Sequence, residues 1–349
     1  MQSATTQTAP KWKRRADYAF RSIVPLAFSI ALIVWLFHRI DFKSMIEVLR
    51  SGVDYRWIVA MMGVTTLSHI IRGYRWGMQL SAAGVNCREA DLAAAVFGNY
   101  ALNLVIPRIG EVWRSIFIAR RKGAKMSVVF GTVLGDRLTD GLTVLALICF
   151  TLLVTSHPID VFIHRYHLGE DALRVISDPL TWCVAATIVT TIYLVLKVWG
   201  NRKFVKDIDA SVANMWKGVK VLATMPHKLK FLALTIGIWV CYFSQIYLSF
   251  YAFPFTRRLV DEPGMAFGLI PALVAFVFST LSMAIPSNGG LGPWNLAIIF
   301  GLSMFGIGAT QGAAFSVLVW GAQSLMLVIL GIYTAIYIMT TRKKAAIKP

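Results

Sequence analysis

The chain has 349 residues, of which 57% are hydrophobic and only 15% are charged, and its mean hydropathy is +0.63. A soluble globular domain does not carry such long apolar runs, so the composition predicts an all-α, polytopic membrane helix bundle. The net charge of +18 does not indicate nucleic-acid binding, because the basic residues stand in short loops beside apolar runs without any DNA- or RNA-binding motif.

The first 22 residues form a basic arm in front of an apolar run, 23–37. His38-Arg39-Ile40 follows this run where a signal peptide needs small residues, so we expect an uncleaved first span. Lys and Arg accumulate on the cytoplasmic side of membrane proteins. The arm, 1–22, and the basic tail, 341–349, are therefore both expected in the cytoplasm.

Further long apolar runs lie near 57–71, 127–155, 180–199, 231–253 and 312–339. Since about 20 residues cross the hydrocarbon core, all these runs together predict about six full spans in one transmembrane domain, 23–340. The acidic loop 156–179 is expected outside the cell and the lysine-rich loop 201–230 inside. Apolar residues at helical spacing in the latter loop indicate either a helix on the inner leaflet or a solvated connector.

A shorter run, 92–106, ends at Pro107 and Gly110, and basic residues flank it on both sides. Both flanks are therefore expected in the cytoplasm, so this segment is predicted to enter the membrane and return as a broken-helix hairpin. Non-helical backbone at that depth survives only inside protein or beside water. The turn at Pro107 is therefore predicted to be a functional site.

A second interruption separates the runs 266–285 and 294–305, and it contains Pro286, Asn288, Gly289, Gly290 and Gly292. The expected orientation makes this hairpin enter from outside, so the halves 23–155 and 180–340 would form an inverted repeat. Broken helices in corresponding positions of inverted halves point to a transport site near the midplane. The halves show no clear residue-by-residue similarity, so the repeat is a hypothesis.

Polar side chains of the first hairpin are candidate site residues. Asn99 and Asn103 are one helical turn apart, so they would either line a polar groove or form hydrogen bonds between helices. Arg108, Glu111 and Arg114 are spaced by three residues, which would place them on one helix face. Two guanidinium groups can grip a phosphate. The alternative is an ordinary loop with solvated charges.

Charged residues elsewhere leave two interpretations open. Asp136, Arg137 and Asp140 fall near the inner boundary of the span 127–155, as a structural pair of Arg137 with Asp140 or as part of the groove of the first hairpin. Arg75 ends the second span, where it is either a positive-inside anchor or a ligand of a lipid phosphate. Gln245 is expected to be a helix-packing contact.

Several motifs are missing from the sequence. It contains no GxxxxGK[ST] phosphate loop, no HExxH and no GxSxG, so neither ATP use nor a familiar catalytic motif is indicated. The four cysteines have no CxxC spacing, and His157, His164 and His167 are only a weak metal signal. We expect no cofactor, no metal site and no enzymatic activity.

Four groups of residues resemble the lysylphosphatidylglycerol synthase transmembrane region family, a flippase-like domain. They are Pro107-Arg108-x-Gly110-Glu111-x-x-Arg114, Arg75-Trp76, Asp136-Arg137-x-x-Asp140 and Gly289-Gly290-Leu291-Gly292. The resemblance covers residues 23–340. It implies a bacterial inner-membrane bundle with re-entrant elements that moves phospholipid or polyprenyl-linked headgroups between leaflets. No aminoacyltransferase domain follows before Pro349, so lysine transfer to lipid is not expected.

The sequence departs from the family pattern at three positions. Asp136 stands where the family usually shows Glu, Asn295 where relatives commonly have Glu, and Gly321 where the last span often has Arg. The charges at the last two positions are absent here, and both positions bear on coupling and on substrate identity.

These observations predict a lipid flippase or transporter of the bacterial inner membrane. Arg108 and Arg114 are expected to bind the phosphate of an anionic phospholipid or polyprenyl-phosphate lipid, while Glu111 and Asp136 balance charge. Self-association into a homo-oligomer is left open. Two alternatives are an integral-membrane enzyme acting on lipid phosphates, with Glu111 as general base, and an accessory subunit of a cell-envelope complex.

Overall fold

The computed structural model describes residues 42–50, 52–154, 216, 220 and 224–346. All regular structure in this part of the chain is helical, which confirms the predicted all-α class. The first helices are α2 (Phe42–Arg50), α3 (Tyr55–Ala82), α4 (Glu89–Val105), α5 (Ile109–Lys122) and α6 (Met126–Val154). The later ones are α11 (Lys228–Ala252), α12 (Pro254–Val260), η1 (Pro263–Met265), α13 (Leu269–Ser282), η2 (Asn288–Gly290), α14 (Pro293–Ser303) and α15 (Ala309–Ala346).

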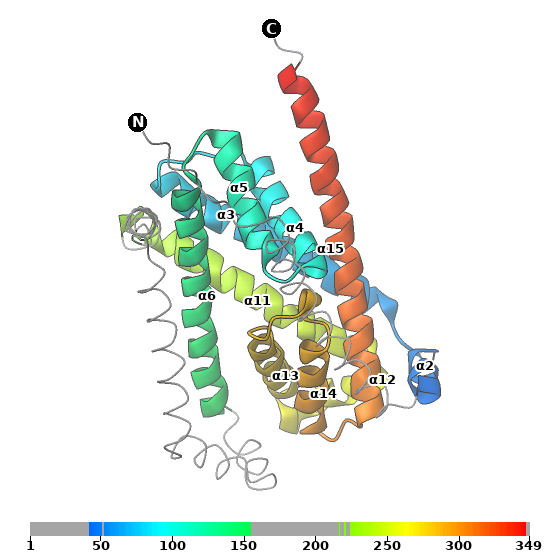
Figure 1. Cartoon of the computed structure of the whole chain (residues 1–349). Helices are drawn as coiled ribbons and strands as arrows, with labels where there is room; N and C mark the ends of the chain where they lie inside the picture. The colour runs from blue at the N-terminus through cyan, green and yellow to red at the C-terminus, as the bar shows by residue number, and fades with distance from the viewer. Residues whose placement is uncertain (1–41, 51, 155–215, 217–219, 221–223, 347–349) are drawn as a thin grey trace, which may run out of the picture. The chain divides into compact units, whose positions relative to one another are not determined.

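Four of the predicted full spans correspond to the long helices α3, α6, α11 and α15 (Figure 1). The last three are long and apolar enough to cross a membrane, and α3 has 28 residues but carries three arginines. The other two predicted spans, 23–37 and 180–199, lie outside the described residues. So do the basic arm, the acidic loop with its histidines, and most of the loop 201–230.

Two pairs of shorter helices occupy the positions of the predicted hairpins. The helices α4, α5, α13 and α14 have 17, 14, 14 and 11 residues, which at a rise of about 1.5 Å per residue is less than the thickness of the hydrocarbon core. The segment Pro263–Ser282 is apolar enough for a span. However, Ala266, Phe267 and Gly268 have positive φ angles, so the continuous helix begins only at Leu269. The lengths fit two broken-helix hairpins.

The chain forms two compact units. The first unit contains α3 as far as Arg75, residues 88–117, and the chain from Leu232 onward. The second contains residues 76–87 and the described residues from Ile118 to Phe231. The inverted repeat itself stays a prediction.

Within the first unit, α13 and α14 form a short hairpin and α14 packs on α15, as Figure 1 shows. Small residues allow these close contacts: a methyl group on Gly301 would lie 3.1 Å from the Cα atom of Ala275, and one on Gly312 would lie 3.3 Å from that of Ile299. The long helix α15 also packs along α4. Close approach of small residues is a usual way for membrane helices to associate. The second hairpin is therefore held against α15 by backbone contact.

In the second unit, the end of α3 is joined to α6 by a buried hydrogen bond. The indole Nε1 of Trp76 donates to Thr132 Oγ1 at 3.0 Å, and both side chains are completely buried. A small apolar cluster of Met225 and Phe231 packs against Met78. This unit holds the charged residues Asp136, Arg137 and Asp140.

Candidate functional site

The turn of the first hairpin has an unusual backbone at Arg108. The helix α4 ends at Val105, Ile106 is its C-cap, and α5 begins at Ile109. Between them Arg108 has a φ angle of +62°, in the left-handed region that non-glycine residues seldom adopt. Such a conformation costs roughly 1–3 kcal/mol and persists only where the surroundings hold it. The side chain of Arg108 is exposed, so the conformation is not explained by burial of that residue.

A hydrogen bond joins Arg108 to the second hairpin. Its Nη2 donates to the carbonyl oxygen of Ala284 at 2.9 Å, just beyond the C-cap of α13. Carbonyl groups at a helix C-terminus have no partner within the helix and carry a partial negative charge. A guanidinium is therefore a favourable donor at this position.

The second hairpin also donates a side-chain hydrogen bond to a backbone carbonyl of the first. The side-chain Nδ2 of Asn288 donates at 2.9 Å to the carbonyl oxygen of Val105, the last residue of α4. In addition, the indole Nε1 of Trp320 in α15 donates to the carbonyl oxygen of Gly289 at 2.9 Å. We call the contact between residues 104–108 and 284–289 the tip junction. Each hairpin thus donates one side-chain hydrogen bond to a backbone carbonyl in the turn of the other hairpin.

The start of α5 is anchored to α4 by an asparagine. Asn103 Oδ1 accepts a hydrogen bond of 2.8 Å from the backbone N–H of Gly110, and Asn103 Nδ2 lies 3.5 Å from Glu111 Oε2. Gly110 is packed so closely that an added methyl group would overlap the backbone oxygen of Asn99. Asn103 thus forms hydrogen bonds within the hairpin, whereas Asn99 Oδ1 is buried without a hydrogen-bond partner among the described residues. Whether the two amides line a polar groove stays a prediction.

The arrangement of Arg108, Glu111 and Arg114 differs from the expected single helix face. The helix α5 begins after Arg108, whose left-handed backbone takes it out of the three-residue periodicity. Arg114 lies within α5 and is only 1% exposed, whereas Arg108 is exposed. The two guanidinium groups therefore do not share an exposed helix face. Arg108 is the one that is accessible at the turn.

The second interruption owes its shape to glycines and a local cap. Gly289, Gly290 and Gly292 have φ angles of +58°, +84° and +91°, all in the region that favours glycine. The backbone N–H of Gly292 donates to Asn295 Oδ1 at 3.1 Å, which caps the start of α14 in front of Pro293. Asn295, in the position where relatives commonly have Glu, is thus placed as a buried capping residue.

Pro286 is exposed in the same loop, close to the tip junction in sequence. Gly290 lies against Met283, since a methyl group added to it would lie 2.8 Å from the sulfur atom. The residues predicted for the second interruption thus form the turn itself.

The charged candidate residues outside the hairpins are mostly buried, and they are divided between the two units. Arg75 is completely buried in the first unit, where its Nη1 donates to Thr235 Oγ1 of α11 at 3.3 Å. In the second unit Asp136 is completely buried and Asp140 is 8% exposed, while Arg137 is exposed. Whether these three residues share a groove with Arg108 stays a prediction.

Two residues that contact the turns were not predicted from the sequence: Ala284 in the tip junction and Trp320, which donates to the turn from α15. The first contributes only its backbone carbonyl, which no side-chain pattern marks, and the second is one aromatic residue among many in apolar runs. Gln245 was expected to be a packing contact, and its Nε2 donates to Gln323 Oε1 at 2.9 Å. Among the described residues, no group of three His, Cys, Asp or Glu side chains is placed to hold a metal ion.

The electrostatics of the tip junction favour a cation, and Arg108 keeps N–H donors that can bind an anion. The C-terminal end of α4 and the turn after α13 both present carbonyl oxygens there, which stabilise the charge of Arg108. In the part of the chain that the structure describes, Arg108 makes one side-chain hydrogen bond, to Ala284. A guanidinium has five N–H donors, so donors remain for an anionic group. Apolar residues close to its position and to that of Ala284 in the sequence are exposed: Val105 is 68%, Met283 53% and Ile285 44% exposed.

Comparison with known proteins gives one match. The family described as lysylphosphatidylglycerol synthase TM region matches residues 22–331. No curated protein and no solved structure matches the chain.

Proposed function

Since the chain belongs to the lysylphosphatidylglycerol synthase TM region family, we propose that it moves the phosphate-bearing headgroup of a lipid across the bacterial inner membrane. The family and the apolar helices make it a multi-pass membrane protein with a lipid-related function. Anionic phospholipids and polyprenyl-phosphate lipids are the substrates proposed here, because both present a phosphate to Arg108. Cytoplasmic N- and C-termini are part of the same proposal.

The observation that carries this proposal is the tip junction. Two broken helices meet there, and their turns bring together a guanidinium and two carbonyl groups that accept hydrogen bonds from the opposite hairpin. A headgroup in plain hydrocarbon costs several kcal/mol for each polar group that loses its partners. A pair of turns that already offers polar partners lowers that barrier, while the acyl chains stay in the surrounding lipid. Broken helices are used in this way at the midplane sites of transporters.

In the proposed mechanism, Arg108 exchanges its partner. The guanidinium leaves the carbonyl oxygen of Ala284 and binds the lipid phosphate, which is a stronger, charge-assisted interaction. The exchange breaks one of the two reciprocal hydrogen bonds and leaves only the Asn288 bond and the packing of Gly289 between the hairpins, so that the two turns can separate while the headgroup passes. When the phosphate departs, Arg108 returns to Ala284. The carbonyl oxygen thus acts as a resting partner for the charge between two transport events.

Glu111 is proposed to limit how tightly the phosphate is held. It lies in the first turn of α5, near Asn103 and three positions from Arg108. A carboxylate near a bound phosphate weakens anion binding by repulsion. Release requires binding that is not too strong, so a nearby negative charge favours turnover over retention.

A transport assay with a shape-preserving variant tests the role of Arg108. Arg108→Asn removes the charge, but asparagine tolerates the left-handed backbone better than most residues. In proteoliposomes that contain headgroup-labelled phosphatidylglycerol, this variant is expected to translocate the label at least about tenfold more slowly, as loss of a charged hydrogen bond implies. The matched control is Arg120→Asn, an exposed arginine of α5, which should keep the wild-type rate. Equal rates for both variants would remove Arg108 from the mechanism.

The transport proposal includes no chemical conversion of the lipid. Mass spectrometry of lipid recovered from the same vesicles is expected to show unchanged headgroups after translocation. A modified or dephosphorylated lipid that forms with wild-type protein but not with Glu111→Gln would instead favour an enzyme with Glu111 as its general base.

A further inference from the structure

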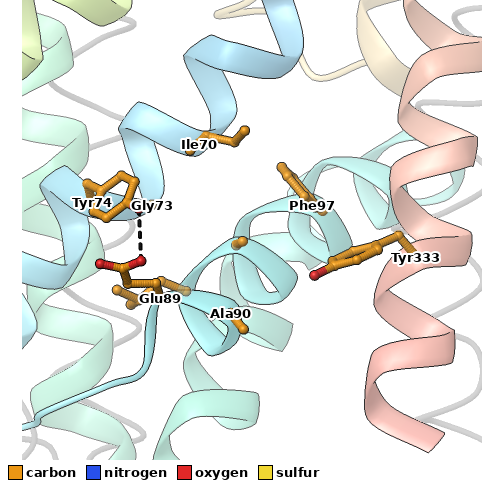
Figure 2. Close-up of a pocket in the computed structure, with 9 residues that line it drawn as sticks. Ile70, Gly73, Tyr74, Glu89, Ala90, Phe97 and Tyr333 are labelled. Atoms are coloured by element: carbon orange, nitrogen blue, oxygen red, sulfur yellow. Dashed lines mark hydrogen bonds between the residues drawn. The ribbon is translucent and has the colours of Figure 1, made fainter. Parts of the chain in front are cut away.

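A pocket lies at the end of α4 that is remote from the tip junction. Its walls come from three helices of the first unit: α3 contributes Ile70, Gly73 and Tyr74, α4 contributes residues from Glu89 to Phe97, and α15 contributes Tyr333. The pocket has a volume of about 240 Å³ (Figure 2). Glu89 and Val105 are the two ends of the 17-residue helix α4, so they lie about 24 Å apart along the helix. The pocket and the tip junction are therefore separate places.

The mouth of the pocket is polar. The Tyr74 hydroxyl donates to Glu89 Oε2 at 3.0 Å, as the dashed line in Figure 2 shows. Both residues are exposed, as is Arg88, which precedes Glu89 at the N-cap of α4. The mouth thus carries a carboxylate that is fixed by a hydrogen bond, and a guanidinium beside it in sequence.

The inner part of the pocket is apolar. Figure 2 shows Phe97 and Tyr333 on the side opposite Tyr74 and Glu89, and their rings meet edge to face with centroids 5.8 Å apart. Gly73 and Ala93, which are both very small, also line the pocket. From Glu89 to Phe97 the pocket follows α4 for about 12 Å. A slot that is polar at one end and apolar along its length matches an amphiphile.

The walls of the pocket are fixed by polar contacts between α4 and α15. The Tyr337 hydroxyl donates to Asp91 Oδ1 at 2.9 Å, and Thr334 Oγ1 donates to the carbonyl oxygen of Ala94 at 3.2 Å. These bonds fix the separation of the two helices in the turn of α15 that follows Tyr333. The slot is therefore a property of the folded helix pair.

We infer that this pocket binds one phospholipid with a primary-amine headgroup, such as phosphatidylethanolamine, from the leaflet that meets the N-terminal end of α4. The ammonium group lies at the Glu89 carboxylate, the phosphate is within reach of Arg88, and one acyl chain fills the slot toward Phe97. A primary ammonium donates hydrogen bonds to a carboxylate, which a choline headgroup cannot do. An anionic headgroup such as phosphatidylglycerol lacks the ammonium and meets the negative charge of Glu89.

Native mass spectrometry of the full-length protein, purified with defined lipids, tests this inference. Wild-type protein is expected to retain one dioleoyl-phosphatidylethanolamine in preference to the phosphatidylcholine and phosphatidylglycerol of the same chains. Glu89→Gln removes the charge but still accepts the Tyr74 hydrogen bond, and it should weaken retention of the amine lipid about tenfold. The matched control Glu262→Gln changes an exposed glutamate far along the chain and should have no effect.

A second pair of variants tests the slot itself. Ala93→Trp fills the space below the mouth and should abolish the retained lipid, whereas Ile329→Trp on an exposed position of α15 should not. Equal retention of all three lipids, a preference for phosphatidylglycerol, or identical behaviour of Glu89→Gln and Glu262→Gln would overturn the inference. Arg108→Asn keeps this lipid if the site is independent, so failure of the transport mechanism and failure of this site are distinguishable.

Discussion

The two turns that meet at the tip junction use different means to solve the same problem. In the first turn, a non-glycine residue adopts a left-handed backbone and carries a charge, and the next helix is anchored by Asn103 from the preceding helix. In the second turn, glycines supply every left-handed position from 289 to 292, and the next helix is capped by its own Asn295. The second turn is therefore a scaffold that offers carbonyl groups. The first places Arg108 where it can use them.

The largest expected effect comes from the anchor of the first turn. Gly110→Ala places a methyl group against the backbone oxygen of Asn99, which cannot move without distorting α4. We expect a loss of about 3 kcal/mol of stability, or failure to fold. Thermal unfolding in detergent and size-exclusion profiles measure this effect. Gly141→Ala, which meets no atom within 4 Å, is the control and should be neutral or stabilising. A Gly110→Ala protein as stable as the control would contradict the described packing.

The next effect concerns the donor that the second turn supplies. Asn288→Asp replaces the amide that donates to the Val105 carbonyl with a carboxylate, which cannot donate when ionised. The open carbonyl and the repulsion between oxygens should cost about 2 kcal/mol. Chemical unfolding in mixed micelles gives the value, and Asn86→Asp on an exposed position is the comparison. If both substitutions cost the same, the reciprocal bond contributes nothing.

A smaller effect distinguishes two buried or half-buried tryptophans. Trp320→Phe removes the donor to the Gly289 carbonyl and should cost about 1 kcal/mol more than a tryptophan without that bond. Trp239 serves for comparison, because its indole N–H has no hydrogen-bond partner among the described residues. The same unfolding measurement on Trp239→Phe gives the contribution of ring size alone. A difference near zero would show that the second turn does not need support from α15.

The smallest effect tests the local cap of the second turn. Asn295→Ala removes the acceptor for the Gly292 N–H and should cost about 1 kcal/mol, whereas Asn295→Ser retains an acceptor and should lose only part of that. The ratio of the two losses, measured by thermal unfolding, separates capping from packing. Equal losses would mean that Asn295 contributes by volume and not by its hydrogen bond.

The sequence predicts two broken helices that share a site near the midplane, but not the hydrogen bonds that join their turns. The short run before Pro107 and the glycine-rich segment after residue 284 both indicate that a helix cannot continue, and the structure has turns at both places. The hydrogen bonds of the tip junction join residues 176 and 183 positions apart in the chain. One of the two partners in each bond is a backbone carbonyl. Periodicity and residue type carry no information about such a pair.

The sequence also did not predict which arginine side chains are buried. Spacing indicates which side chains share a helix face, but it does not say whether another helix covers that face. Arg75 and Arg114 are almost completely buried, while Arg108 at a turn is exposed. A hydropathy pattern treats the three alike. Only the packing around them separates the accessible charge from the two buried ones.

A reversible cross-link at the tip junction tests the central claim most directly. In a protein whose four native cysteines are replaced by serine, Val105→Cys and Asn288→Cys place thiols where the two turns touch. We predict that oxidation joins them within one chain, stops lipid translocation, and that reduction restores the rate; a pair of Val105→Cys and Glu262→Cys should do neither. Absence of the first cross-link in the membrane, or full translocation while it is in place, would contradict the account.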